Sequence, residues 1–88
     1  MDETTFRAEH EARGCRDFHV RDWAPGTINE SHSHDFGAAI LVLDGEITVE
    51  TAAGTTTCRA GDSFSLDAGI AHAERVGPAG VRFLSARR

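Results

Sequence analysis

Three of the five histidines in the 88-residue chain occur in an arrangement that could hold a metal ion. His32 and His34 are two residues apart, and residues at that spacing on a β-strand point to the same face. The pair alone is a weak signal, but His72 follows the turn around Gly69, and a barrel interior could bring it to the first two. Three neutral imidazoles can bind a first-row divalent ion, with nitrogen–metal distances of about 2.0–2.2 Å. The sequence therefore predicts a metal site formed by three histidines.

Glu74 is a further candidate for this site. It lies two residues after His72, so on a regular strand both side chains face the same interior. Its carboxylate could ligate the metal, or it could hydrogen-bond a ligand histidine or act as a general base. A third interpretation is an ion pair near the rim with an arginine such as Arg75 or Arg82.

The elements that must position these side chains are a short helix and a set of strands. The helix is expected at residues 3–13. The acids Asp2 and Glu3 suit the positive N-terminal end of its dipole, and Gly14 suits its C-terminal end. After Gly14, glycines recur roughly every 8–12 residues between short runs, which is typical of an all-β sandwich or barrel. Strands are expected at residues 16–23, 30–34, 38–43, 46–51, 55–59, 63–66, 71–76 and 81–86.

Turn signals and apolar side chains indicate where the hairpins and the core lie. Asp44-Gly45 predicts a hairpin between two apolar runs, and Ala53-Gly54 predicts another turn. Trp23 is expected either in the core or at the edge of a pocket. The other residues expected to line the barrel or form the core are Phe36, Ile40, Val42, Ile47, Val49, Phe64, Leu66 and Phe83.

The strand expected at 38–43 is apolar on both faces. In a protein this small, its outer face should meet either a second subunit or the N-terminal helix. We expect a homodimer. Ile40 and Val42 should line the barrel, and Leu41 and Leu43 should form the subunit contact.

Length and composition restrict the class of protein. The length supports one domain, with a helical segment at residues 1–14 and a single barrel domain at residues 15–88. The net charge of −5 argues against nucleic acid and anionic membranes as partners. No apolar run approaches the roughly 18 residues of a membrane span, and the N-terminus lacks the layout of a signal peptide. We therefore expect a cytoplasmic protein.

Several residue types can be set aside. The chain has no tyrosine, and all nine of its bases are arginine, so lysine Schiff-base chemistry and tyrosine acid–base chemistry are excluded. Cys15 and Cys58 lack the spacing of metal ligands and are interpreted as packing residues. His10 and His19 have no partners at ligand spacing and are interpreted as surface or packing residues.

The stretch GTINESHSHDFGAAILVLDG resembles the first motif of the cupin superfamily. That motif has a glycine, five residues, His-x-His, three or four residues, a glutamate, six residues and a glycine. Gly26, His32, His34 and Gly45 match it at the right spacing. Ala38 stands where the motif has its metal-binding glutamate.

The stretch GDSFSLDAGIAHAERV resembles the second cupin motif. That motif has a glycine, five residues, Pro-x-Gly, two residues, a histidine, three residues and an asparagine. Gly61, Gly69 and His72 match, whereas Asp67 replaces the proline and Val76 replaces the asparagine. The two motifs together span more than half of the chain.

The resemblance implies an all-β fold, a small cupin of the jelly-roll type. This would be an antiparallel β-barrel of six to eight strands with a metal inside, commonly a dimer, here with a short N-terminal helix. The resemblance implies that three of the usual four metal ligands are kept: His32, His34 and His72. Glu74 is a further candidate ligand. Some cupins of the dioxygenase type, which act on thiols or diketones, hold ferrous iron with three histidines. Fe²⁺ is therefore favoured as the cofactor, with Zn²⁺, Ni²⁺ and Mn²⁺ as alternatives.

Three functions are compatible with these residues. The first is a metal-dependent enzyme of the dioxygenase type that acts on a small organic molecule. The second is a non-catalytic module that senses a small molecule or a metal and acts through a protein partner. The third, a metal-free barrel kept for interaction, is disfavoured by the intact histidines. An apolar lining favours a small organic ligand over a sugar phosphate, and catalysis itself is left open.

Overall fold

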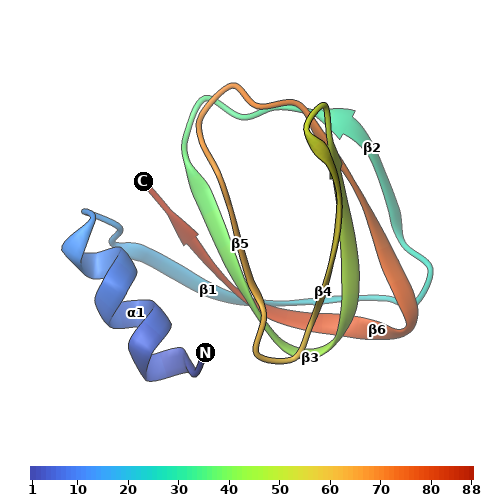
Figure 1. Cartoon of the computed structure of the whole chain (residues 1–88). Helices are drawn as coiled ribbons and strands as arrows, with labels where there is room; N and C mark the ends of the chain where they lie inside the picture. The colour runs from blue at the N-terminus through green and yellow to red at the C-terminus, as the bar shows by residue number, and fades with distance from the viewer.

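The computed structural model describes residues 1–88 and consists of one helix followed by six strands. The elements are α1 (Glu3–Ala12), β1 (Asp17–Trp23), β2 (Ile28–His32), β3 (Ala38–Thr51), β4 (Gly54–Arg59), β5 (Ser63–Leu66) and β6 (His72–Arg87). The strands form an antiparallel sheet that curls around an interior, and α1 lies outside it (Figure 1). The predicted all-β class with a short N-terminal helix is confirmed. The ten-residue helix is too short to cross a membrane.

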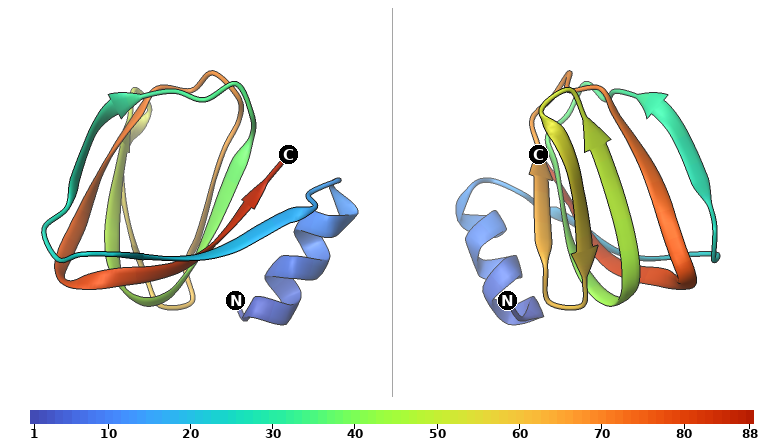
Figure 2. Two further views of the ribbon diagram at one scale, coloured as in Figure 1. Left: turned by 180° about the vertical axis from the view of Figure 1, so that it is seen from behind. Right: turned by 45° about the vertical axis from the view of Figure 1, so that its right-hand side comes forward.

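Two long strands, β3 and β6, organise the sheet. They pair with each other over almost their whole length, and the four shorter strands attach to them. The order along the sheet is β1-β6-β3-β4, with β2 also paired to β6 and β5 also paired to β3. The pairing does not close into a ring, so the expected barrel is an open one, as the two further views in Figure 2 show.

The hairpin predicted at Asp44-Gly45 is wrong, because β3 runs straight through this dipeptide. The strand register shifts on either side of it, which marks a bulge rather than a reversal. Gly45 has a φ of +79°, and a Cβ there would overlap the carbonyl oxygen of Gly80 on β6. The glycine is therefore needed for a close crossing of two bent strands.

The same bend explains why the structure has six strands where eight were expected. Segments 38–43 and 46–51 are two halves of β3, and segments 71–76 and 81–86 fall within or beside β6. Each half of one strand stays paired with a half of the other, so the bulges bend the sheet without ending it. The turn expected at Ala53-Gly54 is present between β3 and β4.

The helix α1 forms where the sequence predicts it. The Asp2 carboxylate accepts a hydrogen bond from the Thr5 backbone N–H at 2.8 Å, which caps the helix and lowers the pKa of Asp2. Gly14 follows the C-terminal end with a φ of +91°. The buried side chains of α1, Phe6 and His10, face the sheet.

An outer cluster of buried side chains lies between α1 and the convex face of the sheet. Its members are Phe6, Cys15, Ala39, Leu41, Leu84 and Ala86. Leu41 is only 1% exposed, and Leu43 packs against the same cluster. Leu41 is therefore buried within this chain, in the cluster beneath α1, and not in a subunit contact as expected. Leu43 is only half buried, so its place in a subunit contact stays a prediction. The homodimer itself stays a prediction, which light scattering can test.

An inner cluster lies on the concave face. Its members are Val42, Ile47, Cys58, Val76, Val81 and Phe83, with Trp23, Ile40 and Phe64 packed against them. Ile40 and Val42 thus face inward, as expected. Cys15 and Cys58 are both buried and free, which confirms that they are packing residues.

Candidate metal centre

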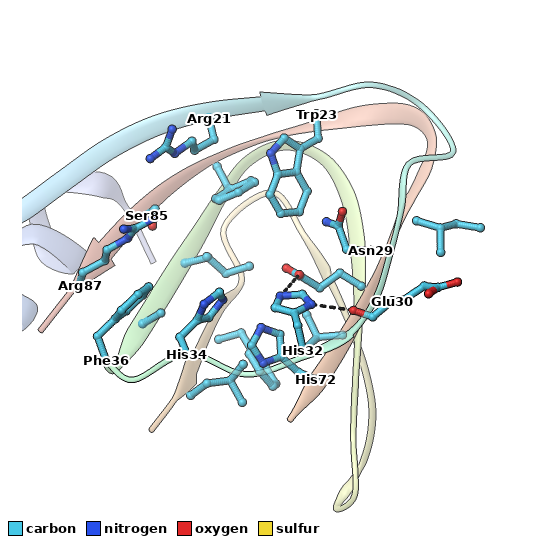
Figure 3. A pocket seen from close by; sticks show the side chains of 18 residues that line it. Arg21, Trp23, Asn29, Glu30, His32, His34, Phe36, His72, Ser85 and Arg87 are labelled. Atoms are coloured by element: carbon cyan, nitrogen blue, oxygen red, sulfur yellow. Dashed lines mark hydrogen bonds and ion pairs between the residues drawn. The ribbon is translucent and has the colours of Figure 1, made fainter. Parts of the chain in front are cut away.

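Three histidines come together on the concave face. Their ligand-capable ring nitrogens all lie within 4.8 Å of one another. The ring centroids of His32 and His72 are 4.4 Å apart, and that of His34 lies 5.0 Å from His32 and 5.3 Å from His72. Figure 3 shows the three rings gathered at one side of the pocket.

Strand pairing explains the positions of two of these rings. His32 is the last residue of β2 and His72 the first of β6, and the antiparallel register places them opposite each other. A register irregularity between Asn29 and His32 adjusts β2 just before the histidine. Residues opposite each other in a sheet present their side chains on the same face, so these two rings must be neighbours.

His34 reaches the site by a different route from the one expected. It lies in the loop after β2 and not on the strand, so the two-residue strand period does not place it. Its carbonyl accepts a hydrogen bond from the Gly69 N–H at 2.8 Å, which ties this loop to the turn before β6. Its ring stacks on Phe36 at 4.8 Å with an interplanar angle of 16°.

Two backbone carbonyls fix the proton positions on the rings. The Nδ1 atom of His32 lies 2.6 Å from the Glu30 carbonyl oxygen, and that of His72 lies 2.9 Å from the Ile70 carbonyl oxygen. A carbonyl oxygen only accepts, so each Nδ1 must carry the proton and donate. In the neutral ring, Nε2 then presents its lone pair, which is the form that a metal ion requires.

Glu74 faces the same site. Its Oε1 atom lies 3.3 Å from His32 Nε2, and its side chain is only 14% exposed. The two arginines considered as rim partners pair with other acids: Arg75 with Glu50 at 3.0 Å and Arg82 with Asp22 at 2.8 Å. The Glu74 carboxylate is therefore turned toward the histidines.

The donor set fits a cation. In the neutral His32 ring, the lone pair of Nε2 points at a carboxylate oxygen, and two acceptors at this distance repel unless a positive species lies between them. A divalent ion would also use the lone pairs of His34 and His72. Nitrogens around one such ion are about 3–3.5 Å apart, so small side-chain rotations from the observed spacing suffice.

Electrostatics also favours neutral ligands. The pKa of His34 is lowered by its burial and, to a lesser degree, by the neighbouring His32, His72 and Arg87. A lowered pKa keeps the imidazole unprotonated to more acidic pH, which is the state that can donate to a metal. Ala38, in place of the motif glutamate, lines the same pocket.

The site opens into a cavity of about 600 Å³. Its apolar wall includes Trp23, whose ring meets Phe83 edge-on at 4.9 Å. The cavity is lined by Arg21, Trp23, Ile28, Asn29, Glu30, His32, His34, Phe36, Ala38, Ile40, Val49, Phe64, Leu66, His72, Glu74, Phe83, Ser85 and Arg87. Such a volume is within the range of pockets for small organic ligands.

Sequence reasoning missed the polar residues of this wall, above all Arg21 and Arg87. A signal for them was present, because they alternate with recognised lining residues: Arg21 with Trp23, and Arg87 with Phe83 by way of Ser85. The two other histidines lie outside the site, as expected. His10 packs on Phe6 with ring centroids 4.4 Å apart, and His19 is exposed.

Known structures share this fold. An uncharacterised protein from Rhizobium leguminosarum matches with a TM-score of 0.75 and 20% identity, over 80% of this chain and 66% of its own. An RmlC-like cupin from Shewanella frigidimarina matches with a TM-score of 0.67 and 22% identity, over 81% of this chain and 65% of its own. Drosophila melanogaster CENP-C bound to CAL1 matches with a TM-score of 0.72 and 19% identity, over 81% of this chain and 63% of its own.

These identities show the fold alone, and this chain spans less than two-thirds of each of the three neighbours. No curated protein sequence matches the chain. The family model for the cupin domain, however, matches residues 19–86, which includes every strand except the first two residues of β1 and the last residue of β6. The chain therefore belongs to the cupin family.

Proposed function

We propose that this protein binds one divalent metal ion through the Nε2 atoms of His32, His34 and His72, and that the metal acts on a small organic ligand in the adjoining cavity. The observation that carries the proposal is the convergence of the three histidines, whose ligand-capable ring nitrogens all lie within 4.8 Å of one another. The contact between His32 Nε2 and Glu74 Oε1 at 3.3 Å adds a carboxylate to this group and can be met by a metal ion or by a proton.

Each residue has a separate task in this proposal. The Glu30 and Ile70 carbonyls hold two imidazoles in the ligating tautomer. Glu74 supplies a negative charge from β6, where it substitutes for the glutamate that Ala38 replaces. A bound ion would supply Lewis acidity and, as Fe²⁺, redox chemistry with O₂. The apolar wall excludes water around the ligand.

The first test is metal content. Protein purified without a metal-affinity tag should contain about one divalent ion per chain by elemental analysis, or take up one on titration. Affinity follows the Irving–Williams order, so Zn²⁺ or Ni²⁺ found after purification must be exchanged for Fe²⁺ before activity is measured. Oxygen consumption with a panel of small thiols and diketones then tests the enzymatic form of the proposal. Stoichiometric metal without turnover would exclude that form.

A non-catalytic binding module is the second candidate, and one feature of the cavity favours it. Glu74 is the acid that contacts the histidines, and the other lining acid, Glu30, is exposed. If Glu74 ligates the metal, no second interior carboxylate remains to move protons. The structurally similar CENP-C is bound to a protein, CAL1, so acting through a protein partner has a precedent in the fold.

Replacing Ala38 by a glutamate distinguishes metal binding from binding of the organic ligand. Ala38 lines the cavity, so Ala38→Glu would place a second carboxylate beside the histidines. We expect tighter metal binding and weaker ligand binding, because the new side chain would fill the open position. Unchanged metal affinity would mean that position 38 does not reach the ion.

A further inference from the structure

The arginines of this chain divide into two groups. Five form ion pairs with acids within 4.0 Å: Arg7, Arg59, Arg75, Arg82 and Arg88. Four do not: Arg13, Arg16, Arg21 and Arg87. Two of these four, Arg21 and Arg87, line the cavity. The cavity wall thus carries two guanidinium groups without an acidic partner within 4.0 Å, although the chain has 14 acids and 9 bases.

The sheet register places both guanidinium groups at one wall. Arg21 is opposite Phe83 in the β1–β6 pairing, and Ser85 and Arg87 follow Phe83 at alternate positions of the same face. Arg21 and Arg87 are thus offset by four residues along the strands, or about 13 Å, a gap that their two long side chains can narrow. Figure 3 shows both on one side of the cavity and Glu30 on the other.

Arg87 is oriented without being neutralised. Its guanidinium lies over the Phe36 ring, 4.6 Å from the centroid, and the same ring stacks on His34. The acid opposite Arg87 in the strand pairing is Asp17, but it forms no ion pair with Arg87 and lies 3.8 Å from His19 instead. The positive charge of Arg87 is therefore held close to the metal-binding histidines and is available to a ligand.

We infer that the cavity takes a small organic carboxylate, with its apolar body against the aromatic wall and its carboxylate group between Arg21 and Arg87. The inference rests on the proposed function only in that the other end of the ligand would face the metal. The aromatic wall is formed by Trp23, Phe36, Phe64 and Phe83.

A carboxylate suits these groups better than a phosphate ester does. Guanidinium groups bind carboxylates and phosphates alike through paired N–H donors, so the rest of the site must discriminate between the two. Phosphate sites typically add backbone N–H groups at the start of a helix, and the one helix of this chain lies on the opposite side of the sheet. The ligand should therefore carry one carboxylate and an apolar or aromatic body.

Trp23 provides a direct measurement, because it is the only tryptophan and it lines the cavity. The protein is titrated at low salt with phenylacetate, 3-phenylpropionate and 4-phenylbutyrate, and binding is followed by the fluorescence of Trp23. The alcohol that corresponds to each acid is titrated in the same way for comparison. We expect at least one carboxylate to bind more tightly than its alcohol. Arg21→Gln and Arg87→Gln should each weaken that binding about tenfold, the range for hydrogen bonds to charged groups, and leave the alcohol unchanged.

Arg13→Gln is the matched control. Arg13 also lacks an acidic partner, but it lies at the end of α1 and does not line the cavity, so its loss changes the net charge equally. Carboxylate binding in Arg13→Gln should equal that of the wild type. Equal binding of carboxylates and alcohols across the series, or equal losses in all three arginine variants, would overturn the inference.

Metal dependence distinguishes this inference from the proposed function. The titrations are repeated on metal-free protein and on a His32→Ala/His34→Ala variant. Carboxylate binding that still depends on Arg21 and Arg87 supports the inference even if no metal binds. The inference is overturned if metal binds stoichiometrically but the affinity for carboxylates is the same in wild type, Arg21→Gln and Arg87→Gln. The proposed metal site would then still be supported.

Discussion

The two faces of β3 and β6 show how one sheet serves two purposes. The outer cluster beneath α1 is closed: Phe6, Leu84 and Ala86 are fully buried among the apolar side chains of this cluster. The concave face combines a buried inner cluster with an open cavity, where two of the three histidines and several aromatic rings are only half buried. The closed apolar layer and the candidate site thus lie on opposite sides of the same two strands.

This difference explains the apolar character of the segment 38–43. Alternate residues face alternate sides of a strand, so Ala39 and Leu41 enter the outer cluster while Ile40 and Val42 face the inner one. A strand apolar on both faces needs two apolar layers, but the second layer can come from the same chain. Substitutions on one face of the sheet can therefore be compared with substitutions on the other face as controls.

The largest effect is expected at the concave face. His32→Ala/His34→Ala removes two of the three proposed histidine ligands, so stoichiometric metal should be lost. The unfolding free energy of the metal-free protein should change little, because both side chains are half exposed and neither belongs to a core cluster. Elemental analysis and urea unfolding measure the two quantities. Retention of one ion per chain would refute the proposed site.

The outer cluster should respond in the opposite way. Phe6→Ala removes a fully buried ring, for which losses of about 3–5 kcal/mol in unfolding free energy are typical. Metal affinity should be unchanged under conditions where the variant is folded. Urea unfolding measures the loss, and Val20→Ala is the control, because Val20 is 52% exposed and should cost little. Equal effects of the two substitutions would show that α1 does not cover the sheet in solution.

A smaller effect on the concave face is expected from Glu74→Gln. The substitution keeps the shape of the side chain but removes its charge beside His32. Metal affinity should fall about 10–100-fold, the range for lost support of a metal ligand, as measured by competition with a chelator. Glu50→Gln is the control, since Glu50 pairs with Arg75 outside the cavity. The same affinity in both variants would remove Glu74 from the site.

The smallest expected effect is a change in the pH dependence of stability that comes from His10, which is buried beside Phe6 of the outer cluster. Its burial lowers its pKa from the ordinary 6.5. In metal-free protein, the unfolded chain therefore binds a proton at a higher pH than the folded chain, so stability falls as the pH drops below about 6.5. It levels off once the pH is below the lowered pKa.

The measurement is the pH dependence of the unfolding free energy. His10→Gln should reduce its slope below pH 6.5 relative to the wild type. An unchanged slope in His10→Gln would show that the imidazole of His10 is not held neutral by the fold.

The predictable part of this molecule rests on local patterns. Asp2 and Gly14 locate the helix, and the strand expected at residues 63–66 has the same bounds as β5. The inward direction of Ile40 and Val42 follows from strand alternation. His32, His34 and His72 could be singled out because their types and spacing resemble the two cupin motifs.

Other features depended on which segments meet in space. Gly45 signals a turn in sequence, but the opposing Gly80 and the continuous pairing of β3 with β6 turn it into a bulge. The sequence favours a second subunit over the helix as the cover of Leu41, but in the structure Leu41 packs in the cluster beneath α1.

The site shows the same division. The sequence determined the residue types of the candidate site, because histidine is the residue whose neutral ring binds divalent metals. The tertiary structure alone decided that His34 approaches from a loop, that Glu74 faces His32, and that Arg21 and Arg87 share the cavity. Local alternation fixes the face on which a side chain lies, whereas long-range strand register and loop contacts fix which other side chains it meets.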